Sequence, residues 1–177
     1  MKPKDPKEFN DGIPIPGKSN VKVELIGSLK QGMPRSIVVN RATHSTRERR
    51  ASFFLALLIT HGRFLGGLPT AISLRGSPLA VSFPTAKDFA DVIEDLKAQN
   101  PREMQGIFDG KKGEKIVSAE VIHGLANELK TLFKKLNAPP KLLQQGPSKI
   151  GYRLGTRPSK LKTNLLDGLQ YTPRRQR

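Results

Sequence analysis

The stretch that decides the fold runs from Ser118 to Leu154 and reads SAEVIHGLANELKTLFKKLNAPPKLLQQGPSKIGYRL. Its first part repeats apolar residues at helical spacing behind Ser118, whose hydroxyl can accept a hydrogen bond from an amide of the first turn. Pro139 and Pro140 end this pattern, because proline does not continue a helix. Lys141–Gln144 and Ile150–Leu154 then flank a short segment rich in turn-forming residues. The sequence therefore predicts a long amphipathic helix followed by a β-hairpin.

Two further helices are predicted before this one. Ser45 and Glu48 have the spacing of a capping box, and the apolar residues that follow them recur at the helical period as far as about His61. A second helix is expected to open at Thr85, with Asp88 completing its cap, and to stop near Asn100 because a proline follows. The chain therefore contains three predicted helices.

Short strands complete the expected fold. Val21–Leu25 alternates apolar and charged residues, and Ser36–Asn40 is a β-branched run, so both are predicted to form a small N-terminal sheet. Thr70–Phe83 resembles a strand, a turn and a strand inserted between the first two helices. We expect an α+β domain over residues 21–154, between a flexible N-terminal arm at 1–20 and a basic, flexible tail at 155–177.

The charge balance limits the class of partner. The chain has 31 Lys and Arg against 15 Asp and Glu, a formal net charge of +16. Such an excess favours anionic partners, namely DNA, RNA or an anionic membrane surface. The absence of cysteine excludes disulfides, cysteine-rich zinc sites and thiol catalysis. No apolar run is long enough to span a bilayer and no secretion signal is apparent, so we expect a cytoplasmic protein with no membrane partner.

Candidate binding residues follow from the predicted helix and hairpin. The helix face opposite the apolar stripe carries side chains that can contact phosphates or the edges of bases, and the hairpin and tail add further cations. The candidates are His123, Asn127, Lys130, Thr131, Lys134, Lys135, Lys149, Arg153 and Arg157. A solvated helix face and a solubilising tail are the simpler alternatives for the same residues.

Three arginines at the start of the first predicted helix form a second basic group. Arg47, Arg49 and Arg50 could contact a DNA backbone or another protein, or could pair with Glu48 or a nearby acid. The sequence leaves these possibilities open.

Signals for catalysis are weak. The three histidines lie in separate segments without metal-ligand spacing, and the glycine-rich stretches form neither a Walker loop nor a dinucleotide fingerprint. The serine and threonine hydroxyls lack an evident base. We therefore expect no enzyme activity, no catalytic residue, no metal site and no cofactor.

From Ser45 onward the chain resembles the winged-helix DNA-binding domain of OmpR/PhoB-type bacterial transcription regulators. The resemblance rests on Ser45–Arg63, which is similar to the family's first helix and following turn, and on Leu129, Leu132, Lys135 and Leu136, whose spacing is similar to that of the recognition helix. It also rests on Gly151-Tyr152-Arg153-Leu154, which is similar to the closing strand of the wing. It implies a winged helix-turn-helix with a small N-terminal sheet, a three-helix core and a C-terminal hairpin wing. In that family the third helix enters the major groove and the wing approaches the minor groove.

These observations predict a nucleoid-associated protein that binds double-stranded DNA sequence-specifically, most simply as a transcription regulator. Pairing of two copies would let it read two half-sites, and the transcription machinery is a further expected partner. Two alternatives remain at this point. One is an RNA or ribonucleoprotein binder, which the small number of aromatic residues disfavours. The other is an assembly or adaptor protein that uses the inserted hairpin for protein contacts.

Overall fold

The computed structural model describes residues 20–60, 84–108, 117–139, 141–145, 151–156 and 160–172. The elements in chain order are β1 (Val23–Ile26), β2 (Arg35–Val39), β3 (Ala42–Thr46), α1 (Arg49–Ile59), α3 (Ala86–Gln99), α4 (Ala119–Lys135), β4 (Leu143–Gln145), β5 (Tyr152–Leu154) and β6 (Leu161–Thr163). The expected N-terminal arm and the inserted hairpin at Thr70–Phe83 lie outside the described residues. The fold is α+β.

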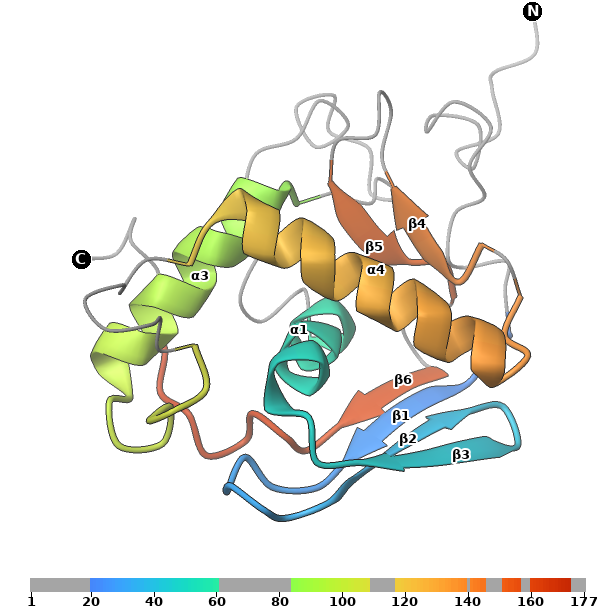
Figure 1. The fold of residues 1–177 in the computed structure, drawn as a ribbon, viewed down its shortest axis with the longest axis horizontal. Helices are drawn as coiled ribbons and strands as arrows, with labels where there is room; N and C mark the ends of the chain where they lie inside the picture. The colour runs from blue at the N-terminus through green and yellow to red at the C-terminus, as the bar shows by residue number, and fades with distance from the viewer. Residues whose placement is uncertain are drawn as a thin grey trace, which may run out of the picture.

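A four-stranded mixed sheet forms one layer, with strand order β3-β2-β1-β6. β1 pairs antiparallel with β2 and parallel with β6, while β2 and β3 form a tight hairpin in which Asn40 has a φ of 54°. Alternate residues of β1 and β2 are buried, among them Val23, Leu25, Ile37 and Val39. The sheet therefore presents one apolar face to the helices (Figure 1).

Helix α1 lies at the centre of the core. Every residue from Ser52 to Leu58 is buried, so the helix is enclosed on all sides. It contacts α4, the hairpin strand β5 and the sheet strands β1 and β6. The centroid of the Phe54 ring lies 5.0 Å from that of Phe89 in α3 and 6.0 Å from that of Tyr152 in β5. Both pairs are edge to face, a geometry that aromatic rings favour. The three helices and the hairpin thus share one core.

Helices α3 and α4 begin where the sequence predicted. The Thr85 hydroxyl accepts from the Asp88 amide while the Asp88 carboxylate accepts from the Thr85 amide, which makes a complete capping box. The Ser118 hydroxyl accepts from the Val121 amide at the start of α4. β4 and β5 pair antiparallel with Leu143 opposite Leu154, as the predicted hairpin requires, but β4 covers Leu143–Gln145 and not Lys141–Gln144.

The capping box predicted at Ser45 and Glu48 is wrong. Ser45 belongs to strand β3, opposite Ser36, and the helix starts four residues later at Arg49. Glu48 itself is the N-cap residue, and its carboxylate accepts from the Arg50 amide at 2.8 Å. Ser45 is therefore part of the β2–β3 hairpin and does not cap the helix.

The segment after Leu154 also differs from the expected flexible tail. Strand β6 pairs with β1, and Thr163 donates through Oγ1 to the Leu25 carbonyl. Leu165, Leu166 and Leu169 are buried in the core. The described part of this segment therefore belongs to the folded domain, because its spaced leucines cover apolar surface that α1 and the sheet would otherwise expose.

Candidate nucleic-acid interface on helix α4

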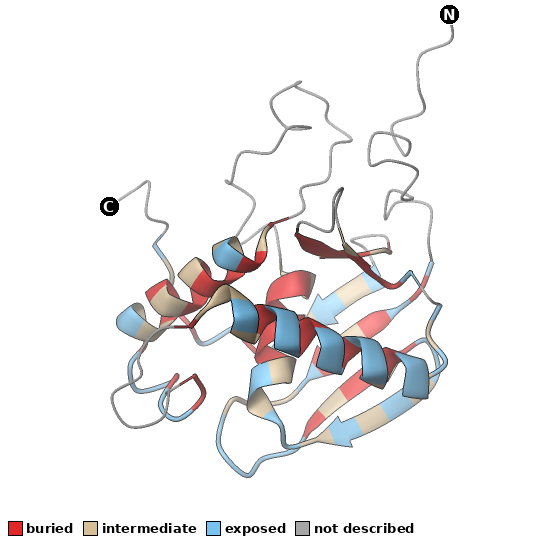
Figure 2. Ribbon diagram, turned by 45° about the horizontal axis from the view of Figure 1, so that its top comes forward, coloured by how far each residue is buried: buried red, intermediate tan, exposed pale blue. Residues whose placement is uncertain are grey.

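Helix α4 is buried on one side and exposed on the other. Ile122, Leu125, Ala126, Leu129 and Phe133 face the core. Figure 2 shows the opposite side as a continuous exposed band along the helix. The exposed residues of that band are Glu120, His123, Gly124, Asn127, Glu128, Lys130, Thr131, Lys134 and Lys135. All six residues that the sequence assigned to this helix as candidates are therefore on its outer side.

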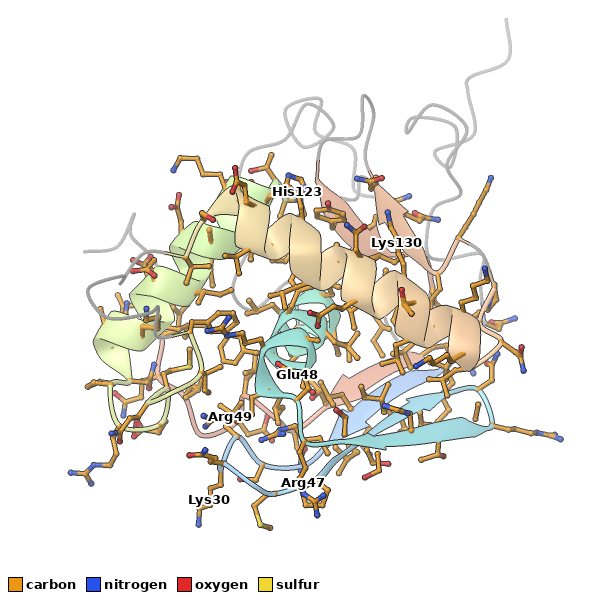
Figure 3. The ribbon with its side chains drawn as sticks, in the orientation of Figure 1. Lys30, Arg47, Glu48, Arg49, His123 and Lys130 are labelled. Carbon is orange, nitrogen blue, oxygen red and sulfur yellow. The ribbon has the colours of Figure 1, made fainter. Side chains whose placement is uncertain are left out.

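The exposed band has two flanks that lie beside different neighbours. At 100° per residue, His123, Asn127, Lys130 and Lys134 share the flank beside the β4–β5 hairpin (Figure 3). Gly124 and Glu128 share the other flank, which borders the first turn of α1. The lysines of the band, Lys130, Lys134 and Lys135, lie at its C-terminal end. Its two carboxylates, Glu120 and Glu128, come before them in the helix.

Side-chain contacts attach the hairpin to α4. Lys130 Nζ donates to Gln145 Oε1 at 3.5 Å, and His123 Nδ1 shares a short hydrogen bond with the Tyr152 hydroxyl. Burial raises the pKa of Tyr152, and the hydrogen bond from Gln145 acts in the opposite direction. The phenol is therefore neutral at physiological pH and fixes the hairpin beside the helix.

Arg153 does not lie on this surface. Its side chain is 3% exposed, and Nε donates to Gln144 Oε1 at 2.7 Å. Burial lowers the pKa of Arg153 to about 10, so the guanidinium is still charged at neutral pH. The buried Arg153 side chain of β5 therefore binds Gln144 of β4 and stabilises the pairing of the two strands. Lys149 and Arg157 lie outside the described residues.

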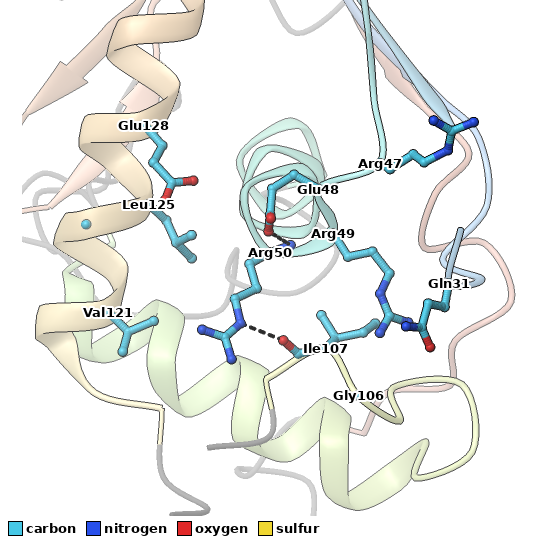
Figure 4. A pocket seen from close by; sticks show the side chains of 11 residues that line it. Gln31, Arg47, Glu48, Arg49, Arg50, Gly106, Ile107, Val121, Leu125 and Glu128 are labelled. Atoms are coloured by element: carbon cyan, nitrogen blue, oxygen red, sulfur yellow. Dashed lines mark hydrogen bonds between the residues drawn. The ribbon is translucent and has the colours of Figure 1, made fainter. Parts of the chain in front are cut away.

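A cleft of about 560 Å³ opens on the other flank of α4. One wall is the start of α1 with Arg47, Glu48, Arg49 and Arg50, and the facing wall is α4. Arg49 and Arg50 extend toward Gly106 and Ile107, whereas the Arg47 side chain extends away from them (Figure 4). Gly106 and Ile107 close one end. The sequence pointed to the arginines but not to this cleft, because Gly106 and Ile107 come close to α1 only in the folded chain.

Three of the arginine side chains are oriented by backbone carbonyls. Arg47 Nε donates to the Gly32 carbonyl at 3.1 Å, and Arg49 Nη1 donates to the Leu29 carbonyl at 3.2 Å. Arg50 Nε donates to the Ile107 carbonyl at 2.7 Å, and its guanidinium lies over the Phe108 ring at 5.9 Å. Carbonyls orient a guanidinium without neutralising its charge.

Within the residues that the structure covers, no three His, Asp or Glu side chains are grouped so as to hold a metal ion. No helix of that part of the chain is long and apolar enough to cross a membrane.

Comparison with known proteins yielded no matching family model, no matching curated protein and no matching solved structure.

Proposed function

We propose that this protein is a winged helix-turn-helix protein that binds double-stranded DNA, with α4 in the major groove and the β4–β5 hairpin as the wing. The observation that carries the proposal is the exposed outer side of α4, which holds Asn127, Lys130, Thr131 and Lys134 while its inner side is packed on the core. A 17-residue helix is about 25 Å long, and the major groove admits an α-helix.

The element order supports the same proposal. In the described part of the chain, helices α1, α3 and α4 are followed by the β4–β5 hairpin, which contacts α4 through Lys130 and Gln145. Asn127 and Thr131 can bond to base edges, and the lysines can contact phosphates. The proposal includes a role in transcription regulation, a location on the nucleoid and pairing of two copies on half-sites.

The test measures affinity for duplex DNA across a range of salt concentrations, for the parent chain and for Lys130→Ala, Lys134→Ala and the double variant. Each lost phosphate contact should lower the slope of log affinity against log salt by roughly 0.9. Lys162→Ala removes an exposed lysine from β6, outside α4 and the β4–β5 hairpin, and should leave the slope unchanged.

A slope equal to the parent's in the double variant would contradict the proposed role of α4. Competition with structured RNA separates the proposal from RNA binding, since a duplex-DNA protein should be displaced by unlabelled duplex at lower concentration than by RNA. Absence of any salt-dependent DNA binding by the parent chain would overturn the proposal as a whole.

A further inference from the structure

The cleft between the start of α1 and α4 has an unusual charge balance. Arg47, Arg49 and Arg50 line it together with two carboxylates, those of Glu48 and Glu128. The Glu48 carboxylate already accepts the Arg50 amide as the helix cap. In the part of the chain that the structure describes, no ion pair joins Arg47 or Arg49 to a carboxylate. An amide hydrogen bond does not neutralise the Glu48 carboxylate, so the ionisable side chains that line the cleft carry one net positive charge.

A fourth guanidinium lies close to the others but below the surface. Arg35 of β2 is 1% exposed, and its Nη2 donates to the Lys30 carbonyl at 3.0 Å. Its Nε and Nη1 have no hydrogen-bond partner among the described residues. Burial, and after it the charge of Arg49, lowers the pKa of Arg35, whereas Glu48 acts in the opposite direction. A buried cation with unmet donors adds to the positive potential felt at Arg49.

Arg49 is held in place by a close backbone approach. Gly106 has a φ of 79°, and a Cβ at that position would lie 2.9 Å from Arg49 Nη2. Arg49 Nη1 meanwhile bonds to the Leu29 and Gln105 carbonyls. The guanidinium is therefore pre-positioned between the β1–β2 turn and residues 105–106, and less side-chain entropy is lost when it binds an anion.

We propose that this cleft binds a phosphate group through Arg49 and Arg50. Planar guanidinium groups match the geometry of phosphate oxygens, and a cleft of about 560 Å³ has room for a group larger than one phosphate. The phosphate comes from the backbone of a duplex lying on α4 or from a free phosphorylated molecule. Only the first source rests on the proposed function.

Gly124 offers a way to change the charge of the cleft without removing an arginine. It lines the cleft on the α4 wall, and a Cβ built there meets nothing within 4 Å. Gly124→Glu adds a carboxylate facing the arginines, and Gly124→Gln adds a side chain of the same shape without charge. Arg50→Gln removes one cation at an exposed position.

The first arm of the test titrates the full chain with pyrophosphate and follows binding by calorimetry. Gly124→Glu and Arg50→Gln should each weaken pyrophosphate binding by about fivefold or more, and Gly124→Gln by less than about twofold. Equal affinity in all four proteins, or no pyrophosphate binding together with an unchanged DNA salt slope in Arg50→Gln, overturns the proposal.

The second arm identifies the source of the phosphate. If the cleft takes a backbone phosphate, Arg50→Gln should reduce the salt slope for duplex DNA by roughly 0.9, and pyrophosphate should compete only weakly with the duplex. If it takes a free phosphorylated molecule, pyrophosphate should bind at submillimolar concentration and the slope should stay at the parent's value. A parent chain that binds pyrophosphate but no DNA retains this proposal and refutes the DNA function.

Discussion

Tyr152 joins three parts of the molecule through a single side chain. Its ring contacts Phe54 of α1, its hydroxyl bonds to His123 of α4, and its amide donates to the Pro84 carbonyl at 2.9 Å. The residue is 2% exposed, so it cannot be a stacking surface for a base. Its role in this structure is to fix the hairpin relative to the outer side of α4.

Two glycines near the proposed interface should respond oppositely to substitution by alanine. A Cβ at Gly155 would lie 2.5 Å from both Gln144 Nε2 and the Lys141 carbonyl oxygen, whereas one at Gly124 would be in open space. Gly155→Ala should lower the free energy of unfolding by about 1–3 kcal/mol through overpacking. Gly124→Ala should raise it by about 0.5–1 kcal/mol, because alanine is the better helix former.

The free energy of unfolding of both variants is measured by urea unfolding, and the comparison with the parent holds where the m-value is unchanged. Both variants add the same methyl group, so a difference between them reports the space around each glycine. A destabilised Gly124→Ala, or a Gly155→Ala of parental stability, would show that the packing around these glycines differs from the structure.

Among the elements, the helices and the hairpin could be read from the sequence and two strands could not. Thr85 with Asp88 and Ser118 are local signals that act within one helical turn. Strand β3 reads ATHST and strand β6 reads LKT, so neither has the alternation of a half-buried strand. Both strands form because a neighbour offers unpaired backbone groups, and that neighbour is far away in the sequence for β6.

For the candidate site, too, some features could be predicted from the sequence and others could not. The helical period placed Asn127, Lys130 and Lys134 on the outer side of α4, because that period follows from the apolar stripe alone. The burial of Arg153 could not be read from the sequence, since its strand GYRL alternates like one with a polar face. Both sides of β5 are covered in the fold, and this depends on where the rest of the chain passes.

The element β6 and the leucines after it should be necessary for stability. Leu166 is 1% exposed, so Leu166→Ala should cost about 2–5 kcal/mol of unfolding free energy through lost burial and a cavity. Lys162→Ala, in the exposed part of the same segment, should change it by less than about 0.5 kcal/mol. Thermal and urea unfolding of both variants check this. If Leu166→Ala unfolds with the parent's free energy, the segment after Leu154 does not stabilise the domain, and this prediction is wrong.

At the scale of the whole molecule, positive charge is spread over more than one surface. Lys130 and Lys134 lie on α4 and the arginines line the cleft, while Lys22 and Arg41 are exposed on the sheet side. Net charge alone therefore does not locate a DNA interface. What distinguishes α4 is the combination of an exposed polar side, a length suited to the major groove and a hairpin fixed beside it.

The most direct test of this account is a residue-by-residue map of amide chemical-shift changes when a short DNA duplex is added to the isotope-labelled protein. The account predicts that the largest changes fall on the exposed positions of α4 from His123 to Lys135 and on the β4–β5 hairpin, with little change in β2 and β3. Changes concentrated on the outer face of the sheet, with α4 unaffected, would contradict it.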